Sequence, residues 1–332
     1  MAVKTILEEI EKDVIDVVNT KFVYNNAIVV PSPNDAELTY ESGSEKKGKK
    51  METCVLYVDI RNSVALTEKH HNITMGKIYT AFTKAVLKVA RHHNGHTRNI
   101  IGDRVMIVFP STNCFENAIN CAISINHIAN NIINKQFTGV DFKCGIGIDY
   151  GELRIIKVGI QRHGNEHGEN KGLVWAGYPA NIASRLTDNA NKTIENTYYE
   201  VIRNPLNPRA IKPLFPLSYS FFGHKSNYDP NAPLHLTTTE TINMSTEDFA
   251  SSFQQYNDGS IYTMNGKLIS FEKKTNKYTY PSILMTEAVY NGFKKGNPKH
   301  ITIVKNYWVV QSHQFKNVNQ KVFGGNLHWD IK

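Results

Sequence analysis

Two apolar runs, each ending in an aspartate, constrain this chain more than any other feature. The first is Leu56-Tyr57-Val58-Asp59, and the second is Ile100-Ile101-Gly102-Asp103, which a further apolar run follows. Each run places a carboxylate at the end of a buried strand, where an isolated charge is costly unless it is paired or bound to a cation. Two such acids that meet would hold a pair of divalent cations suited to phosphoryl chemistry.

Composition indicates an ordinary globular protein, since 41% of the 332 residues are hydrophobic and 20% are charged. No apolar stretch approaches the roughly 18 residues of a membrane span, and the N-terminus lacks a signal-peptide core. The four cysteines have no metal-ligand spacing, so we expect reduced core residues in a cytoplasmic protein. The net charge of +8 favours a polyanionic partner without choosing among nucleic acid, an anionic membrane and a nucleoside triphosphate.

Hydrophobic periodicity predicts one amphipathic helix over residues 3–19, which packs on the core or joins a partner. The polar segment Pro31–Lys50 is predicted to be a linker, and its run Lys46-Lys47-Gly48-Lys49-Lys50 is expected to be solvated. Residues 1–50 therefore form an N-terminal helix and linker, and residues 51–332 the main domain.

The main domain begins with alternating strand and helix patterns. We predict strands and helices, in chain order, at 54–60 (strand), 62–71 and 73–93 (helices), 100–101 and 105–109 (a hairpin), 113–133 (helix), 142–148 and 153–158 (a hairpin turning at Tyr150-Gly151), and 179–187 (helix). Residues 161–171 are predicted to be a polar loop. The order β-α-β-β-α-β predicts an α+β, ferredoxin-like core with helices on one face of an antiparallel sheet.

Periodicity is lost between residues 190 and 280, which we interpret as an irregular insertion. Order returns at residues 281–290, predicted as a strand and then a helix capped by Thr286. Two late strands are predicted at 301–311 and 327–331.

These motifs resemble the catalytic domain of class III nucleotidyl cyclases. Tyr57-Val58-Asp59-Ile60-Arg61 and Ile101-Gly102-Asp103 are similar to the metal motifs of that family, and Gly177–Leu186 is similar to its Asn-x-x-x-Arg helix. Gly145–Glu152 and Ser282–Phe293 resemble two further family segments. The resemblance covers about residues 52–189 and 281–332.

The resemblance implies a metal-assisted cyclisation of a nucleoside triphosphate. Asp59, Asp103 and the main-chain carbonyl of Ile60 would hold two divalent ions, Mg²⁺ or Mn²⁺, at each site. Arg185 would stabilise charge on the α-phosphate, and Asn181 would orient the ribose. In the family, the metal-binding acids and the Asn/Arg pair of one site come from different protomers. The resemblance therefore implies a head-to-tail homodimer with shared sites. No nucleic-acid or membrane partner is expected.

The residues that select a purine in this family are absent. Lys or Glu is expected four residues before the second metal Asp, where this chain has Asn99, and Asp or Cys at the position of Val174. Tyr57 lies two residues before Asp59 and so shares its face of the strand. A phenol there could fill the space that a smaller base leaves. The segment Tyr57–Ser63 resembles the pyrimidine cyclases of bacterial Pycsar anti-phage systems, which make cyclic UMP or cyclic CMP for a separate effector protein.

Several alternatives stay open from the sequence. The substrate is UTP or CTP, and a purine cyclase with unusual base-binding residues is the main alternative. A degenerate cyclase fold that only senses nucleotides is the non-enzyme alternative, although Asp59, Asp103, Asn181 and Arg185 are all retained. A phosphate-binding role is a weaker hypothesis for four residues: Arg61, Asn62, Ser63 and Lys321.

Overall fold

The computed structural model describes residues 3–40, 45–162, 165–211, 228–264, 266–313 and 315–331. It divides into two compact units. The first comprises residues Met1–Lys192 and Tyr280–Lys332, and the second comprises Thr193–Thr279.

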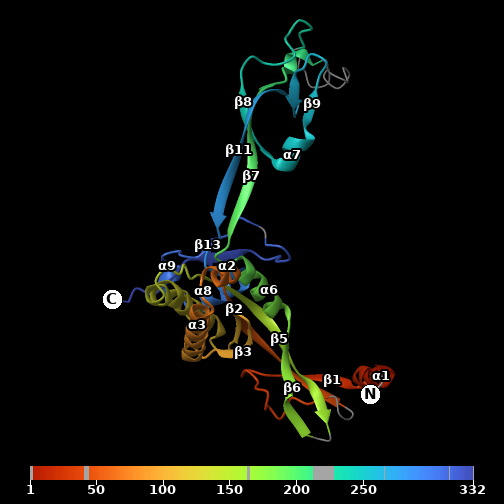
Figure 1. The fold of residues 1–332 in the computed structure, drawn as a ribbon, viewed down its shortest axis with the longest axis vertical. Helices are drawn as coiled ribbons and strands as arrows, with labels where there is room; N and C mark the ends of the chain where they lie inside the picture. The colour runs from red at the N-terminus through yellow and green to blue at the C-terminus, as the bar shows by residue number, and fades with distance from the viewer. Residues whose placement is uncertain are drawn as a thin grey trace. The chain divides into compact units, whose positions relative to one another are not determined.

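The first unit is built on a sheet whose strands run in the order β13-β14-β12-β5-β2-β4-β3 (Figure 1). Four of these strands are β2 (Glu45–Ile60), β4 (Arg104–Val108) and β5 (Cys144–Arg162), which lie inside the sheet, and β3 (His96–Ile101), which ends it. β2 pairs antiparallel with both β4 and β5. The connections through the helices after β2 and after β4 give the predicted β-α-β-β-α-β order, so the ferredoxin-like core is confirmed.

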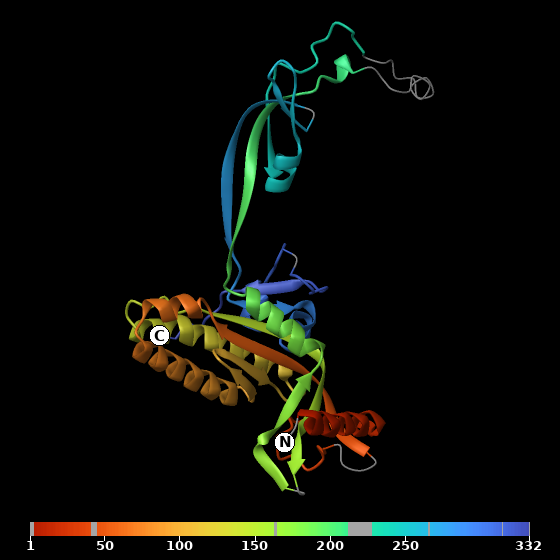
Figure 2. The ribbon, with the colours of Figure 1, turned by 45° about the vertical axis from the view of Figure 1, so that its right-hand side comes forward.

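Helices cover both faces of this sheet, and not one face as predicted (Figure 2). The helices after β2 are α2 (Ser63–Lys69) and α3 (Asn72–His92), and those after β4 are α4 (Cys114–His127), a π-helical turn (Ile128–Ile133) and α5 (Asn134–Gln136). Buried side chains of α3 and α4, such as Phe82 and Ile119, pack against one face. The other face packs against α6 (Tyr178–Asn189) through Ala180 and Ala183.

The N-terminal helix is confirmed as α1 (Val3–Asn19), and none of its residues is buried. β1 (Lys21–Asn26) pairs parallel with the first residues of β2. The prediction of a linker up to Lys50 is therefore wrong, because residues 45–50 belong to β2. Strand pairing holds their main chain, and Lys49 Nζ lies 2.7 Å from carboxylate oxygens of Asp35 and Glu37. Residues 41–44 of the predicted linker lie outside the described residues.

β5 is one continuous strand, so the predicted turn at Tyr150-Gly151 is wrong. Tyr150 and Gly151 lie opposite Cys54 and Thr53 of β2 in an uninterrupted ladder, which satisfies their main-chain groups without a turn. β5 continues into a hairpin with β6 (Asn165–Ala176). The polar loop predicted at 161–171 thus falls largely on paired strands.

The C-terminal part of the first unit confirms one prediction and corrects another. β12 (Ile283–Thr286) is followed by α8 (Glu287–Gly296), as expected. Thr286 occupies the N-cap position of α8 as predicted, but its hydroxyl donates a hydrogen bond to Asp149 and accepts none from the helix. The late strands agree with the prediction only in part. Within 301–311, the first residues form α9 (Ile301–Val304) and only β13 (Val309–Val310) is a strand. The second late strand is β14 (Val322–Gly325), and residues 327–331 form no strand.

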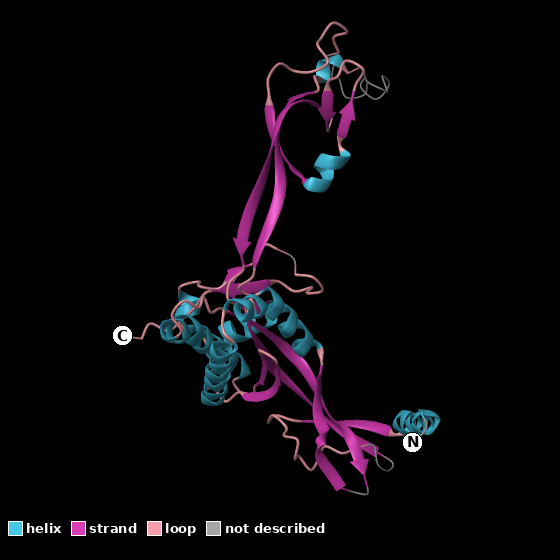
Figure 3. Ribbon diagram, viewed as in Figure 1, coloured by secondary structure: helices cyan, strands magenta, loops and turns pink. Residues whose placement is uncertain are grey.

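The second unit is an ordered five-stranded antiparallel sheet, so the prediction of an irregular insertion is wrong (Figure 3). Its long pair is β7 (Thr193–Pro205) with β11 (Gly266–Thr279). The remaining elements are a 3-10 turn (Pro208–Ala210), β8 (Glu240–Ser245), α7 (Thr246–Ser251), β9 (Phe253–Gln255) and β10 (Ile261–Thr263). Residues 212–227 of the predicted insertion lie outside the described residues.

All four cysteines are buried and free, which confirms the prediction of reduced core residues. Within the described ranges, no helix combines the length and the apolar character needed to cross a membrane.

Candidate active site

The structure brings the carboxylates of Asp59 and Asp103 together. Asp59 lies near the end of β2, and Asp103 lies in the turn between β3 and β4. Burial raises the pKa of Asp103, and the negative charge of Asp59 raises that pKa further. A hydrogen bond with Ser63 opposes the shift. The two acids therefore form a pair whose mutual repulsion a cation would relieve.

Arg104 partly neutralises this pair from the same protomer. Its Nη2 lies 2.7 Å from Asp59 Oδ2 and also contacts Asp188 of α6, and its Nη1 donates to Ser184 Oγ over 2.9 Å. The sequence did not single out Arg104, Ser184 or Asp188. The signal was available for Arg104, because strand alternation from the Gly102-Asp103 turn places it beside Asp59.

The acidic pair meets one requirement of a divalent cation site. Asp59 Oδ1 is buried and has no hydrogen-bond partner among the described residues. An oxygen of this kind is the hard, unsatisfied ligand that Mg²⁺ or Mn²⁺ prefers. Ile60, whose carbonyl was predicted as a further ligand, ends β2 directly after Asp59. The described residues hold no cluster of three or more His, Cys, Asp or Glu side chains, so remaining ligands would be main-chain, substrate or water oxygens.

A row of residues crosses the sheet on the same face as Asp59. Asn99 lies opposite Met106, Met106 lies opposite Tyr57, and Tyr57 lies opposite Gly147. Burial raises the pKa of Tyr57, so its phenol keeps its proton at neutral pH. Two of the three residues predicted to contact the base, Tyr57 and Asn99, thus share one face.

The third of these residues, Val174, points the other way. Val174 lies opposite Ile156 on β5, whereas Trp175 lies opposite Ile155, which belongs to the cluster that packs with Tyr57. Since neighbouring side chains of a strand alternate between faces, Trp175 and not Val174 lies on the face of Tyr57.

Helix α6 is held close to this face by glycines. A Cβ atom on Gly147 would lie 2.2 Å from the Ala183 carbonyl oxygen of α6. Thr187 Oγ1 donates to the Tyr57 carbonyl oxygen over 3.1 Å. The Gly145–Glu152 motif therefore serves to seat α6 against β5 beside Tyr57.

Two of the four residues predicted to bind phosphate, Arg61 and Ser63, have other side-chain partners. The Arg61 guanidinium donates to the Thr187 carbonyl at the end of α6, and burial lowers its pKa. Ser63 hydrogen-bonds with Asp103. The main-chain carbonyl of Lys321 accepts a hydrogen bond from Glu287, and its side chain is exposed. Asn62 adopts a left-handed conformation with φ 55° at the start of α2.

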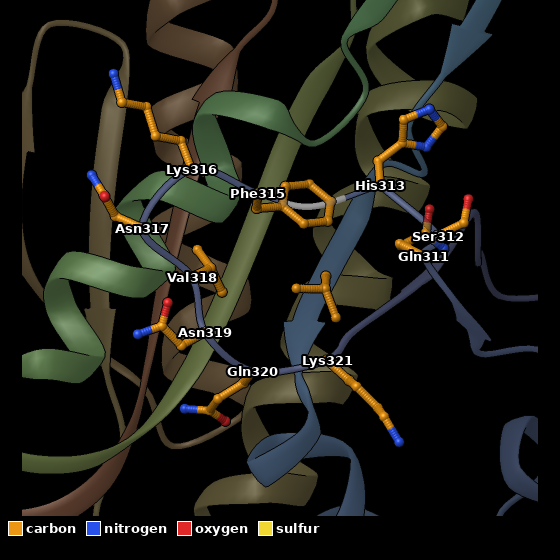
Figure 4. Close-up of a pocket in the computed structure, with 11 residues that line it drawn as sticks. Gln311, Ser312, His313, Phe315, Lys316, Asn317, Val318, Asn319, Gln320 and Lys321 are labelled. Carbon is orange, nitrogen blue, oxygen red and sulfur yellow. The ribbon is translucent and has the colours of Figure 1, made fainter. Parts of the chain in front are cut away.

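Asn181 and Arg185 lie one turn apart on α6, as predicted, but neither contacts the acidic pair of its own chain within the described residues. Asn181 is exposed, and Arg185 Nη1 donates to the Asn317 carbonyl oxygen over 2.9 Å. Asn317 lies in the loop before β14, and residues 311–313 and 315–322 line a cavity of about 700 Å³ (Figure 4). In this view Lys316 lies at the far bend of the loop and Lys321 near its C-terminal end, and their side chains point away from one another. Among the described residues, one chain therefore brings the two acids together without a contact from Asn181 or Arg185 to either of them.

Comparison with known proteins shows which family the chain resembles. Residues 45–198 match the family described as the adenylate and guanylate cyclase catalytic domain. A uridylate cyclase of Burkholderia cepacia is 30% identical over 190 residues, which cover 56% of this chain and 78% of that protein. A uridylate cyclase of Gulbenkiania mobilis is 24% identical over 193 residues, which cover 54% of this chain and 70% of that protein. A cytidylate cyclase of Staphylococcus aureus is 29% identical over 119 residues, which cover 33% of this chain and 28% of that protein.

A solved structure, the adenylyl cyclase CyaB of P. aeruginosa, aligns with a TM-score of 0.43 at 11% identity, covering 83% of this chain and 94% of that one. The chain belongs to the adenylate and guanylate cyclase catalytic domain family. It is a nucleotidyl cyclase.

Proposed function

We propose that this protein is a pyrimidine nucleotide cyclase, which converts UTP or CTP to the 3′,5′-cyclic nucleotide and pyrophosphate. The observation that carries the proposal is the placement of Tyr57, whose protonated phenol shares a face with Asp59 and Asn99. A phenol beside the acidic pair reduces the room for a purine and offers one hydrogen bond to a smaller ring. The names of the three relatives, two uridylate cyclases and one cytidylate cyclase, support the same assignment.

The acidic pair is proposed to hold divalent cations. Asp59, Asp103 and the Ile60 carbonyl are the candidate ligands, and the unpartnered Asp59 Oδ1 fits that role. When bound, Mg²⁺ or Mn²⁺ would lower the pKa of the ribose 3′-hydroxyl and neutralise the triphosphate. In the proposed reaction the 3′-hydroxyl would lose its proton to water and its oxygen would bond in line to the α-phosphorus. The bond from the α-phosphorus to the oxygen that bridges to the β-phosphate would break, and pyrophosphate would leave.

Two side chains of α6 complete the proposed mechanism. Arg185 offers a guanidinium to the charge that grows on the α-phosphate oxygens, and Asn181 fixes the ribose so that the attack geometry is preformed. Arg185 now contacts the Asn317 carbonyl and must leave it to reach a substrate. Because neither residue contacts the acidic pair of its own chain among the described residues, and because the resemblance implies sites shared between protomers, we propose a head-to-tail homodimer with two shared sites.

A product assay tests the proposed function. The protein is incubated with each of ATP, GTP, UTP and CTP in the presence of Mn²⁺, and the cyclic products are measured by mass spectrometry. We expect cyclic UMP or cyclic CMP to dominate. Tyr57→Ala should lower the ratio of cyclic pyrimidine to cyclic purine product about tenfold. Cyclic AMP as the dominant product of the unmodified protein would refute the pyrimidine assignment and favour a purine cyclase. Asp103→Asn, which keeps the shape of the side chain, is expected to abolish every product.

The cellular role is proposed from the Pycsar resemblance alone. The cyclic nucleotide would serve as a second messenger of bacterial antiviral defence, acting on a separate effector protein. Cells that carry the unmodified protein should accumulate the cyclic pyrimidine nucleotide after phage infection, and cells that carry Asp103→Asn should not. Equal nucleotide levels before and after infection would contradict this role.

A further inference from the structure

A cation–π pair lies on the Tyr57 face of the sheet, beside Asn99. A β-bulge between Thr97 and Asn99 places Arg98 out of register in β3. The guanidinium carbon of Arg98 lies 5.7 Å from the centre of the Trp175 ring. The Trp175 ring packs against the same apolar cluster as Tyr57. The pair thus joins β3 and β6 across the face that carries two of the predicted base contacts.

Arg98 is poorly satisfied for a cation in this position. Within the described part of the chain its Nη atoms have two long contacts, 3.3 Å to the Thr97 carbonyl oxygen and 3.4 Å to that of Val30. Its Nε is buried and has no hydrogen-bond partner among the described residues. Within the same ranges no carboxylate pairs with Arg98. Unmade hydrogen bonds of a buried donor cost free energy, so a retained donor of this kind is suited to an incoming acceptor.

Arg154 shows what a satisfied arginine of the same sheet looks like. Its guanidinium carbon lies 5.8 Å from the Tyr24 ring centre, a distance close to that of the Arg98–Trp175 pair. Arg154 also pairs with the Glu152 carboxylate, whose oxygen lies 2.8 Å from Nη2. The aromatic contact alone therefore does not distinguish Arg98. Arg98 differs from Arg154 because, within the described residues, no carboxylate accepts hydrogen bonds from its guanidinium.

We infer that Arg98 and Trp175 form the subsite that reads the substrate base, with the indole stacking on the ring and the guanidinium donating to a ring carbonyl oxygen. This inference rests on the proposed pyrimidine cyclase activity and deepens it. Arginine has five N–H donors and no acceptor, so it complements a ring edge that carries oxygen acceptors. Uracil presents carbonyl oxygens at both positions that flank its N3, whereas cytosine presents an amino donor at one of them. The subsite therefore selects UTP over CTP.

The test separates base reading from a purely structural role. Arg98→Lys keeps the charge but loses the planar fork, and Trp175→Phe keeps an aromatic ring of smaller area. Arg154→Lys is the matched control, since it alters the other cation–π pair of the sheet. Steady-state kinetics with UTP and CTP are combined with calorimetric binding of UMP and CMP in EDTA, a readout that needs neither metal nor turnover.

We expect Arg98→Lys to raise KM for UTP about tenfold with a smaller change in kcat, and to lower the UTP-to-CTP ratio of kcat/KM by a similar factor. UMP binding should weaken in parallel, CMP binding should change less, and Trp175→Phe should weaken both. Arg154→Lys should leave all values unchanged.

Parallel losses for UTP and CTP, with an unchanged ratio and a lower melting temperature, would assign Arg98 to structure and overturn the inference. An unmodified protein that prefers CTP would overturn it as well. A protein that makes only cyclic purines would instead refute the proposed function on which the inference rests.

Discussion

The guanidinium of Arg104 lies 2.7 Å from Asp59 Oδ2 and holds a carboxylate that the proposed chemistry needs for cations. Both side chains are largely buried, with exposed fractions of 27% for Arg104 and 14% for Asp59. Removal of Arg104 leaves two neighbouring carboxylates without their cation. We expect Arg104→Ala to lower the free energy of unfolding by about 2 kcal/mol in EDTA.

Divalent cations should offset part of this loss. The increase in melting temperature on addition of MnCl₂ should be larger for Arg104→Ala than for the unmodified protein, because the acidic pair is then free to bind the metal. Lys143→Ala removes an exposed ion pair with Asp141 and provides the control. Equal metal-dependent increases in all three proteins would contradict the assignment of Asp59 and Asp103 as ligands.

A mixing experiment tests the shared sites. Asp103→Asn and Arg185→Ala should each be inactive alone, because the first damages the acidic half and the second the α6 half of every site. In an equimolar mixture about half of the dimers are mixed, and each mixed dimer keeps one intact site of two. Activity should therefore return to about a quarter of the original value. If the mixture stays inactive after subunit exchange has been verified, the sites are not shared.

Close packing of α6 on β5 gives a third prediction. In Gly147→Ala the added methyl group would meet both the Ala183 carbonyl oxygen, at 2.2 Å, and the Thr187 nitrogen, at 2.5 Å. We expect α6 to shift, with a loss of about 1–3 kcal/mol in the free energy of unfolding and a fall in kcat. Chemical denaturation and product assays measure the two effects.

The control for this substitution is Gly76→Ala in α3. A Cβ atom there has no neighbour within 4 Å, and alanine is the better helix former, so this variant should gain up to about 1 kcal/mol. Destabilisation of Gly76→Ala to the same extent as Gly147→Ala would show that the close contact is not the cause.

Asp149 gives a prediction for pH dependence. It is 1% exposed, and burial raises its pKa from 3.8 to about 6, although a 2.6 Å hydrogen bond from Thr286 favours the ionised form. Between about pH 4 and 6 the folded chain holds a proton that the unfolded chain has lost. Asp149 therefore makes stability fall as pH rises through this window. Asp149→Asn keeps an oxygen acceptor for Thr286 and removes the charge.

We expect Asp149→Asn to raise the free energy of unfolding by about 1–3 kcal/mol at pH 8 and to have no effect at pH 4. Urea denaturation at several pH values measures this difference. Asp141→Asn, at an exposed position, should show a flat profile. If Asp149→Asn raises the free energy of unfolding no more at pH 8 than at pH 4, then burial does not disfavour the ionised form of Asp149.

The core of the fold could be predicted because its elements have one buried face. The helix Asn72–His92 and the hairpin around Gly102-Asp103 carry clear periodicity and turn residues. β5 was predicted as two strands because Tyr150-Gly151 has the composition of a turn, and only its pairing with β2 overrides that preference. β11 was missed because it is exposed along most of its length, so its sequence lacks the alternation of a half-buried strand.

The candidate site was predictable to the level of motifs and not of contacts. The meeting of Asp59 and Asp103 follows from the position of each at a strand end in this topology. Arg61 was assigned to phosphate, but its partner is a main-chain carbonyl of α6, which sequence spacing does not reveal. Whether Val174 or Trp175 lies on the face of Tyr57 depends on the register of β6 against β5. A shift of one residue in this register would move every side chain of β6 to the opposite face of the sheet.

The strand pair β7 and β11 leaves and rejoins the cyclase core at a single place, since Tyr280 N donates to the Lys192 carbonyl oxygen over 3.0 Å. A short connector between these residues would therefore close the backbone if the whole Thr193–Thr279 unit were excised. We expect the same junction to tolerate a foreign domain whose termini are adjacent. Accessory domains would then be exchanged at this junction without a change in the strand order of the cyclase core.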